Sequence, residues 1–346
     1  MKKTITSILF SYITLGLYSQ DIHFSQFTET VMNISPALCG TANGFLRAGL
    51  NYRSQWGAFG KSYQTYGFSA DAPLVASKKT RGAYLGAGLN IFQDKSGNAN
   101  LSTLHLAGDI SSILALNNHS TLSLGFEVAY AQRSIRGSGL KWDAQWQNNQ
   151  YDPSASSGES ENAAKAAFDF GGGMAYVMRL KPSTISSNDG LELIISGGVY
   201  HFTHPNLGVG GSDPLNIRYT GMIHSTIGIF NTNLRLTPRL LYNQQGSLRE
   251  INPGCIFYYV LKNASSFTGY NMESAFGVGA SYRLGDAIIP EIHYYNGNFF
   301  CGISYDINIS ALTPYSAARG GLEVTLRFTD VAGTLFGQGG GSARSF

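Results

Sequence analysis

Apolar and polar residues alternate with a period of two along most of the chain after residue 45. The clearest example is the segment 168–180, with apolar side chains at Phe168, Phe170, Met174, Tyr176, Met178 and Leu180. The positions between them hold small or polar residues, namely Asp169, Gly171, Gly173, Ala175 and Arg179. A helix would scatter the apolar residues around its circumference, whereas a strand gathers them on one face. The pattern therefore predicts strands with one apolar face and one small or polar face.

Such alternation defines fourteen candidate strands, at 45–56, 61–73, 82–94, 101–115, 119–133, 166–180, 190–203, 217–230, 233–243, 249–261, 273–284, 286–295, 298–309 and 319–328. An even number is typical of single-chain bacterial transmembrane barrels, in which every second residue faces lipid. Short connections at 117–118, 285–286 and 296–297 hold Asn, Gly and Asp, which tolerate the positive φ of tight hairpins. We therefore predict an all-β fold, a transmembrane antiparallel β-barrel of about fourteen strands. A large soluble β-sandwich is the alternative.

Composition favours the membrane interpretation. Charged residues make up 13% of the chain, against about a quarter in typical soluble domains, whereas Gly, Tyr and Phe number 42, 20 and 20. No run of about twenty apolar residues follows the N-terminal region, which argues against membrane-spanning helices. Without Lys2 and Lys3, 22 basic residues stand against 21 acidic ones. This balance argues against nucleic acid as a partner, because phosphate binding requires a concentrated basic surface.

The two ends of the chain have features of their own. Two lysines precede an apolar stretch and a small residue, which is the order found in a secretory signal peptide, here 1–19. Residues 20–44 then form an N-terminal periplasmic or lumen segment with the character of a plug, and 45–328 form the barrel. The glycine-rich sequence at 339–343 indicates that 329–346 is a flexible tail of artificial origin.

Strand order assigns the connections to the two ends of the barrel. If the first strand begins in the periplasm, every connection after an odd-numbered strand faces the cell exterior. The long connections 134–165 and 204–216 are then both outside, as long loops are in such barrels. We therefore expect a multi-pass barrel in the cell outer membrane with these two loops at the cell surface.

The sequence does not predict a catalytic centre. Charged residues on the predicted lumen faces are Glu127, Asp169, Glu192, Glu323, Arg47, Arg53, Arg133, Arg179 and Arg327. Their opposite charges indicate an ion-paired, hydrated filling more simply than acid–base catalysis. His201 and His204 lack a third ligand nearby, and Cys39, Cys255 and Cys301 show no metal-binding spacing, although a Cys39–Cys255 bridge stays open. We expect no enzyme activity, no cofactor and no metal.

Three motifs near the N-terminus carry a family resemblance. Residues 20–27 read QDIHFSQF, 33–40 read NISPALCG and 52–56 read YRSQW. In this order they resemble the start of the PorP/SprF family of Bacteroidetes outer-membrane proteins, whose members have DPxFSQ, NPAxAG and YRxQW. Residues 141–146, KWDAQW, are similar to the WDxQ loop of the SprF-like branch. The motif residues, expected in a plug or as family signature, are Phe24, Ser25, Gln26, Asn33, Pro36 and Gly40.

This resemblance implies a role in type IX secretion and gliding motility. Family members hold a secreted, adhesin-like surface protein through its C-terminal region, or form part of the envelope-spanning apparatus, and the WDxQ loop favours holding. Exposed aromatic side chains dominate many interfaces. The residues expected to bind the partner are Trp142, Asp143, Gln145, Trp146, Tyr151 and Asn206. The alternative for the two tryptophans is a lid over the barrel mouth.

The expected partners are thus a secreted surface protein, other type IX secretion or envelope components and outer-membrane lipid, with no nucleic acid. The alternative function is a passive outer-membrane channel or small-molecule transporter. A channel needs an open lumen, and fourteen strands could enclose one. Inward-facing charges together with residues 20–44 could close it.

Overall fold

The computed structural model describes residues 21–55, 57, 62–75, 82–97, 100–136, 141–147, 150–156, 162–182, 188–209, 211–263, 272–310 and 313–331. The signal peptide expected at 1–19 lies outside the described residues. So does all but the first part of the tail expected at 329–346. Both stay predictions.

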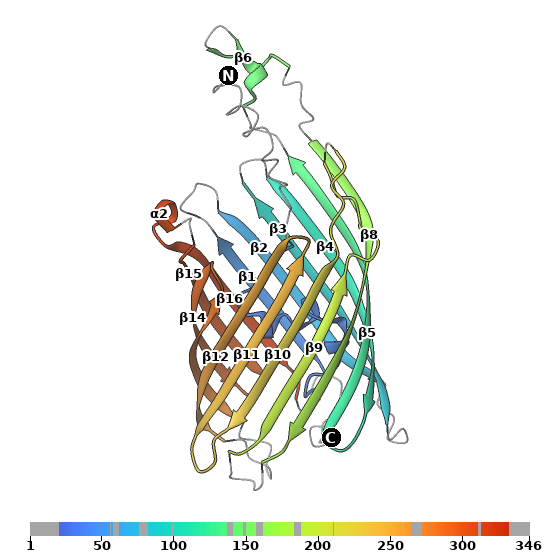
Figure 1. The fold of residues 1–346 in the computed structure, drawn as a ribbon, viewed down its shortest axis with the longest axis vertical. Coiled ribbons are helices and arrows are strands. Elements are labelled where there is room, and N and C mark those ends of the chain that lie inside the picture. The colour runs from blue at the N-terminus through green and yellow to red at the C-terminus, as the bar shows by residue number, and fades with distance from the viewer. Residues whose placement is uncertain are drawn as a thin grey trace, which may run out of the picture.

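Within the described chain, fourteen strands close into one antiparallel barrel in which β1 pairs with β16 (Figure 1). The barrel strands are β1 (Arg47–Gln55), β2 (Tyr63–Val75), β3 (Ala83–Ser96), β4 (Leu101–Ala115), β5 (Ser120–Arg136), β8 (Asn162–Leu180), β9 (Leu191–Tyr200), β10 (Arg218–Gly228), β11 (Leu234–Gln245), β12 (Leu248–Lys262), β13 (Ser274–Arg283), β14 (Ala287–Asn296), β15 (Phe299–Asn308) and β16 (Arg319–Thr329). Closure pairs the edges of the sheet, as a barrel in lipid requires. The predicted fourteen-stranded barrel is confirmed.

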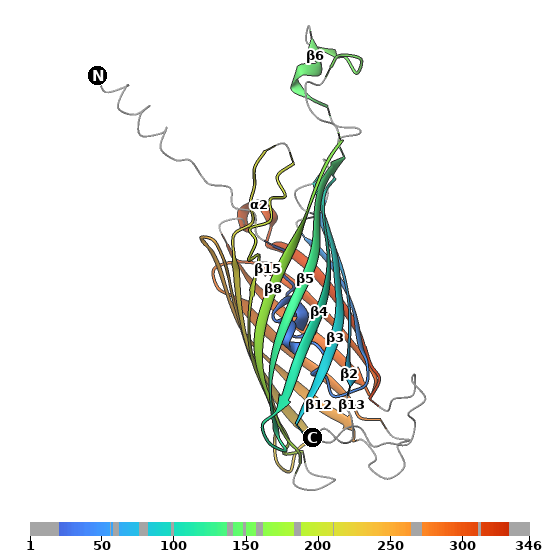
Figure 2. The same cartoon turned by 90° about the vertical axis from the view of Figure 1, so that its right-hand side faces the viewer.

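The two ends of the barrel differ. β5 and β8, with 17 and 19 residues, extend beyond the other strands on the side where their long connection lies (Figures 1 and 2). We call this the upper end and the opposite one the lower end. The loop between β9 and β10 and the short helix α2 (Thr313–Ser316) also lie at the upper end. The two long connections that were expected to face the cell exterior therefore share one end.

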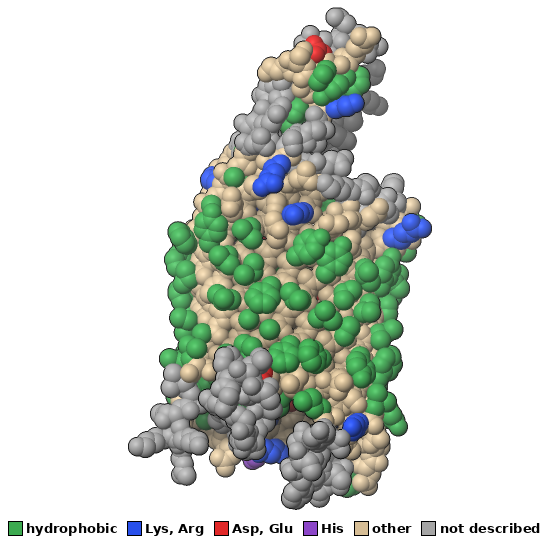
Figure 3. All heavy atoms as spheres, turned by 180° about the vertical axis from the view of Figure 1, so that it is seen from behind, with side chains coloured by type: hydrophobic (Ala, Val, Ile, Leu, Met, Phe, Trp, Pro, Cys, Tyr) green, Lys and Arg blue, Asp and Glu red, His purple; other side chains and the backbone are tan. Residues whose placement is uncertain are grey.

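Side chains alternate between lipid and lumen as predicted. In β1, Leu50 is 55% exposed, whereas Asn51 and Arg53 are 5% and 2% exposed. In β8, Phe168 is 66% exposed and Asp169 is buried. On the face that Figure 3 shows, hydrophobic side chains form a broad belt with Lys and Arg above and below it. Such a belt matches the apolar band of about 25 Å that transmembrane barrels present to lipid.

Three tyrosine–glutamine pairs mark the upper edge of this belt. In each pair the tyrosine Oη donates to the Oε1 of a glutamine two residues nearer the upper end, on the same face of the strand. The pairs are Tyr66–Gln64 at 3.3 Å, Tyr130–Gln132 at 3.4 Å and Tyr242–Gln244 at 2.6 Å. A ring with a polar tip suits the boundary between lipid tails and water, so we place that boundary at these tyrosines.

At the upper end, β5 and β8 are longer than predicted, whereas β9 is shorter, ending at Tyr200 rather than 203. β5 ends at Arg136 rather than 133, and β8 begins at Asn162 rather than 166. Beyond the belt these strands no longer face lipid on one side, so the apolar alternation that located them fades. No helix among the described residues is long and apolar enough to span a membrane.

Candidate functional sites in the lumen and on the upper loops

Residues 21–44 lie inside the barrel (Figure 2). The backbone N–H of Asp21 donates to Gln245 Oε1 at 2.9 Å near the upper end. At the lower end the N–H of Phe45 donates to the carbonyl of Asp330 at 2.8 Å. The segment therefore crosses the whole lumen before β1 begins. Its three 3-10 helices are η1 (Phe27–Glu29), η2 (Val31–Asn33) and η3 (Pro36–Leu38).

An ion-pair cluster anchors the upper end of the segment. Asp21 Oδ2 lies 2.6 Å from His201 Nε2 and 3.2 Å from an Arg218 nitrogen, and His201 Nδ1 lies 2.6 Å from Asp169 Oδ2. Burial alone would lower the pKa of His201, but the attraction of Asp21 and its hydrogen bonds to both carboxylates raise that pKa to about 9. Burial alone would raise the pKa of Asp21, but His201 and Arg218 hold it well below its usual value. The imidazolium and the carboxylate are thus both charged near neutral pH.

The first family-like motif contacts the carboxylates of β15 and β16. The N–H groups of Ser25 and Gln26 donate to the two oxygens of Glu323 at 2.7 and 2.9 Å. Ser25 Oγ also donates to Asp306 Oδ1 at 2.7 Å. Arg53 lies 2.7 Å from Asp306 and 3.5 Å from Glu323 and balances their charge. Charge-assisted hydrogen bonds of this kind are stronger than neutral ones, so the motif is held firmly.

The remaining motif residues also lie in the lumen. Phe24 is buried, and Asn33 Oδ1 accepts a hydrogen bond from Asn90 Nδ2 at 2.5 Å. Pro36 starts η3. Gly40 has φ +72°, a conformation that favours glycine, and its N–H donates to an Asp71 carboxylate oxygen at 2.7 Å. The family-like motifs are therefore the residues that fit the segment to the wall.

Side chains of the wall satisfy the backbone carbonyls of the segment. Tyr200 Oη donates to the carbonyl of Met32, and Ser123 Oγ to that of Ala37, both at 2.7 Å. Buried carbonyls without partners are costly, and short 3-10 helices leave several of them free. Further carbonyls, those of Asn33, Ile34, Leu38, Cys39 and Thr41, accept from Arg218, Thr220, Arg47, Ser111 and Arg179.

Glycines in the wall allow the segment to approach the strands closely. A Cβ added to Gly125 in β5 would overlap the backbone of η3, and one added to Gly198 in β9 would overlap the carbonyl of Ile34. A Cβ added to Gly173 in β8 would likewise overlap the side chain of Ser35. Gly173, in the middle of β8, thus makes room for the segment to pack against the wall.

An apolar core forms between the segment and β8–β11. Phe27, Met32, Ile34 and Leu38 belong to one buried cluster that includes side chains of those strands. The guanidinium of Arg239 also lies 5.2 Å from the ring centre of Phe27. The strand members of this cluster are Ala175, Val177, Met222 and Leu241. Residues 21–44 therefore supply a hydrophobic core to the inside of the barrel.

Most of the charged lumen residues predicted from sequence form ion pairs; Glu127 differs, because its nearest basic group among the described residues is His105 Nε2 at 3.9 Å. Examples are Arg47 with Asp71 at 2.7 Å and Arg327 with Glu29 at 2.8 Å. The prediction of an ion-paired filling is confirmed for these groups. Further buried charged or titratable groups face the lumen beside the predicted ones, and the same alternation places them there, namely Asp71, Asp109, Arg218, Arg239, Arg283, Glu291, His293 and Asp306.

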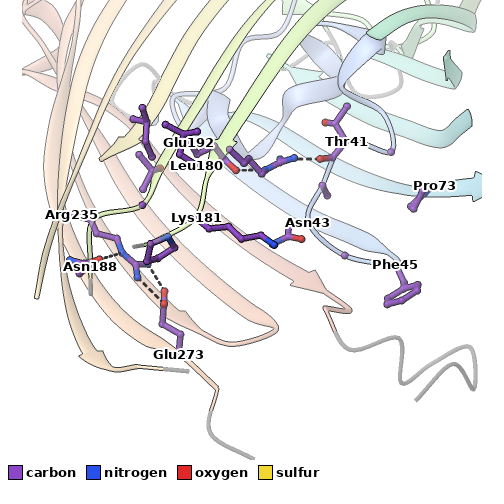
Figure 4. A pocket seen from close by; sticks show the side chains of 18 of the residues that line it. Thr41, Asn43, Phe45, Pro73, Leu180, Lys181, Asn188, Glu192, Arg235 and Glu273 are labelled. Atoms are coloured by element: carbon purple, nitrogen blue, oxygen red, sulfur yellow. Dashed lines mark hydrogen bonds and ion pairs between the residues drawn. The ribbon is translucent and has the colours of Figure 1, made fainter. Parts of the chain in front are cut away.

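A cavity of about 470 Å³ remains at the lower end (Figure 4). Two ion pairs cross it, Arg235 with Glu273 at 2.8 Å and Arg179 with Glu192 at 2.6 Å. Lys181 extends toward the end of the segment, at Asn43 (Figure 4). A second cavity, of about 520 Å³, lies at the upper end and is lined by residues 21–23 among others. A third cavity, of about 450 Å³, runs beside residues 28–43 and shares Arg179 and Glu192 with the lower one.

The tip of the long β5–β8 connection folds by itself. It contains the hairpin β6 (Trp146–Gln147) and β7 (Gln150–Tyr151) and stands beyond the upper end of the barrel (Figures 1 and 2). The buried side chain of Gln145 accepts from the N–H of Trp142 at 3.1 Å and donates to the carbonyl of Ala155 at 3.2 Å. Gln145 is therefore a support of the tip rather than an exposed contact residue.

The other predicted residues of this loop differ in exposure. Trp146 is 52% exposed and Asp143 is exposed, whereas Trp142 and Tyr151 are half-buried. The rings of Trp146 and Tyr151 are 5.9 Å apart, and Lys141 Nζ lies 4.7 Å from the centre of the Tyr151 ring. The tip thus presents Trp146 as its large exposed aromatic side chain.

Asn206 lies in the other upper loop, between β9 and β10. Its Oδ1 accepts from the N–H groups of Gly208 and Asp213 at 3.1 and 3.0 Å. Its Nδ2 donates to Ser212 Oγ at 2.9 Å. The loop is also tied to the barrel by Arg133, 2.7 Å from Asp213. These bonds use the polar atoms of Asn206 within the loop itself.

The described residues contain no cluster of three or more His, Cys, Asp or Glu side chains that could hold a metal ion. The two nitrogens of His201 face Asp21 and Asp169, and the Nδ1 of His204 faces the carbonyl of Leu215 at 3.0 Å. All three cysteines are free, so the Cys39–Cys255 bridge left open by the sequence is not formed.

The chain was compared with models of known protein families. Residues 16–328 match the model of the family described as type IX secretion system membrane protein PorP/SprF. No curated protein matches the chain.

Solved structures with a similar fold include three with low sequence identity. The Ralstonia pickettii toluene transporter TbuX has a TM-score of 0.48 and 10% identity, covering 87% of this chain and 93% of that one. The CymD monoaromatic hydrocarbon channel has a TM-score of 0.44 and 9% identity, covering 87% and 92%. BamA from Haemophilus ducreyi lacking POTRA domains 1–3 has a TM-score of 0.41 and 11% identity, covering 83% and 70%.

Proposed function

The chain belongs to the PorP/SprF family of type IX secretion membrane proteins, and we propose that it holds a secreted surface protein through that protein's C-terminal region. Its family and its barrel make it an outer-membrane component of type IX secretion. The holding role, a part in gliding and the identity of the held region are the proposal. We further propose that the protein neither catalyses a reaction nor conducts solutes.

The occupied lumen supports this proposal. Residues 21–44 form an apolar core with side chains of the barrel strands, and wall side chains bond to their carbonyls. A solute could cross only if many of these contacts broke together. The loops outside the membrane are therefore the better candidates for function. The longest of these loops is the β5–β8 connection.

The observation that carries the proposal is the exposed indole of Trp146 on a supported hairpin. Gln145 fixes the hairpin from within, and Tyr151 packs against one side of the Trp146 ring. A large aromatic side chain on a preorganised scaffold binds with a small loss of conformational entropy. Such residues are frequent interface hot spots.

Substituting Trp146 in cells that make the surface protein tests the role. Trp146→Ala should release the surface protein into the medium, since a hot-spot aromatic contributes about 2 kcal/mol, or roughly thirtyfold in affinity. The barrel should still insert and remain heat-modifiable on gels, because the hairpin lies outside the strand ladder. The matched control is Phe202→Ala, another exposed aromatic at the upper end, 48% exposed and outside this loop. Normal retention in the Trp146→Ala strain would overturn the assignment.

A further inference from the structure

A hollow of about 490 Å³ lies on the outer surface of the barrel, near the upper ends of β3, β4 and β5. It is separate from the lumen cavities and from the β6–β7 hairpin. The residues that line it are Gln93, Lys95, Asn100, Ser102, Leu104, Gln132, Ser134 and Arg136.

Strand register organises the floor of this hollow into two rows. Lys95, Ser102 and Ser134 are direct cross-strand neighbours in one row. Gln93, Leu104 and Gln132 form the row below, with Gln93 Nε2 donating to Ser102 Oγ at 3.3 Å. Arg136 follows at the end of β5. Two hydroxyls are thus flanked by two cations, with two amides beneath them.

The hollow faces outward, and it lies just above the apolar belt. Its residues share the strand face of Leu106 and Ile110, which are 44% and 61% exposed. Gln132 accepts the hydroxyl of Tyr130, one of the tyrosines at the upper edge of the belt. Ser134 lies roughly 13 Å along β5 beyond Tyr130, at about 3.3 Å per residue. This depth corresponds to the headgroup layer of the leaflet at the upper end.

The hollow is lined by two cations, Lys95 and Arg136. Among the described residues, no Asp or Glu lines it, and neither Lys95 nor Arg136 forms an ion pair. The lumen-facing arginines differ from these two cations, because each of those named next forms an ion pair with a carboxylate. The ion-paired ones are Arg47, Arg53, Arg133, Arg179, Arg218, Arg235, Arg239, Arg283 and Arg327.

We propose that this hollow binds the phosphorylated headgroup of a lipid of the outer leaflet. Lys and Arg side chains supply charge-assisted hydrogen bonds to phosphate oxygens, and Ser102 and Ser134 supply neutral donors between them. The long stems of both cations let their charged groups adjust in depth to the headgroup. Acyl chains of the same lipid would lie against the belt below, along Leu106 and Tyr130.

A binding measurement on the purified, folded barrel tests the site. The mature protein in detergent is titrated with diphosphorylated lipid A, and bound lipid is counted by native mass spectrometry. The test variant is Lys95→Ala combined with Arg136→Ala. The matched control is Arg249→Ala with Arg319→Ala, which removes two exposed cations at the upper ends of β12 and β16, away from the hollow. Heat-modifiability checks that each variant is folded.

The expected result is binding to wild type and to the control pair, and binding at least about tenfold weaker in the test variant. Lipid A stripped of both phosphates should bind the wild type as weakly as the test variant binds intact lipid A. Equal binding by the test variant would overturn the site. Equal loss in the control pair would show general charge attraction instead. Displacement of the lipid by millimolar inorganic phosphate would show a free-anion site rather than a lipid site.

Discussion

The Asp21 carboxylate and the His201 imidazole form a 2.6 Å ion pair that joins the first described residue of the chain to the loop after β9. His201 has φ +64°, and its other ring nitrogen faces Asp169 in β8. One side chain thus links the lumen segment, an upper loop and the barrel wall. Together with the bond from the Asp21 N–H to Gln245, this junction holds residue 21 at the upper mouth.

This junction should weaken at alkaline pH. Because the pKa of His201 is raised from 6.5 to about 9, its contribution to stability is complete below pH 6.5 and is lost as the pH rises through 9. Hydrogen exchange at residues 21–26, corrected for intrinsic rates, should therefore show lower protection at pH 10 than at pH 6. His201→Asn is the control, because Asn tolerates the positive φ and does not titrate. An equal pH response in this variant would place the cause elsewhere.

Filling the space at Gly125 should displace the segment. Gly125→Leu would overlap η3 and cost about 1–3 kcal/mol, as overpacking of a core does. The buried Cys39 in the segment is a natural reporter, read by maleimide labelling in a Cys255→Ser, Cys301→Ser background. Its thiol should become reactive in Gly125→Leu. It should stay protected in Gly108→Leu, where nothing lies within 4 Å of an added Cβ. Protection of Cys39 in both variants would contradict the close packing.

Labelling of introduced cysteines on intact cells can determine the direction in which the segment crosses the lumen. Ile22→Cys lies in the upper cavity and Asn43→Cys in the lower one, and the two sites are at opposite ends of the barrel. With the upper end at the cell surface, a membrane-impermeant maleimide should label Ile22→Cys and leave Asn43→Cys unlabelled until the envelope is opened. The reverse pattern would invert the orientation of the barrel.

The strands could be predicted from sequence because lipid imposes a period of two. Every second residue of a strand such as β8 faces lipid, and the residues between them face the lumen. The apolar Phe168 and the charged Asp169 therefore indicate which face of the strand is which. The same alternation predicted which charged residues face the lumen, but it could not predict which residues they pair with. Register across strands, which decides that Arg47 meets Asp71, depends on the whole closed sheet.

The path of residues 21–44 could not be predicted in this way. Its 3-10 helices are too short to leave a periodic pattern, and its contacts join residues far apart in sequence, as when Ser25 meets Glu323. The family-like motifs indicated that the segment matters without showing why. Likewise, sequence alone could not separate the exposed Trp146 from the half-buried Trp142, since the difference depends on how Gln145 ties the loop together.

The central claim is that residues 21–44 close the lumen, so that the barrel acts through its outer surfaces. Its most direct test is the conductance of the mature protein in planar bilayers, with folded insertion verified by heat-modifiability in the same preparation. We predict no steady conductance, because the segment is bonded to the wall from Asp21 to Gly40 and shares an apolar core with β8, β10 and β11. Stable, long-lived channels from the full-length mature protein would contradict the account and favour a transporter.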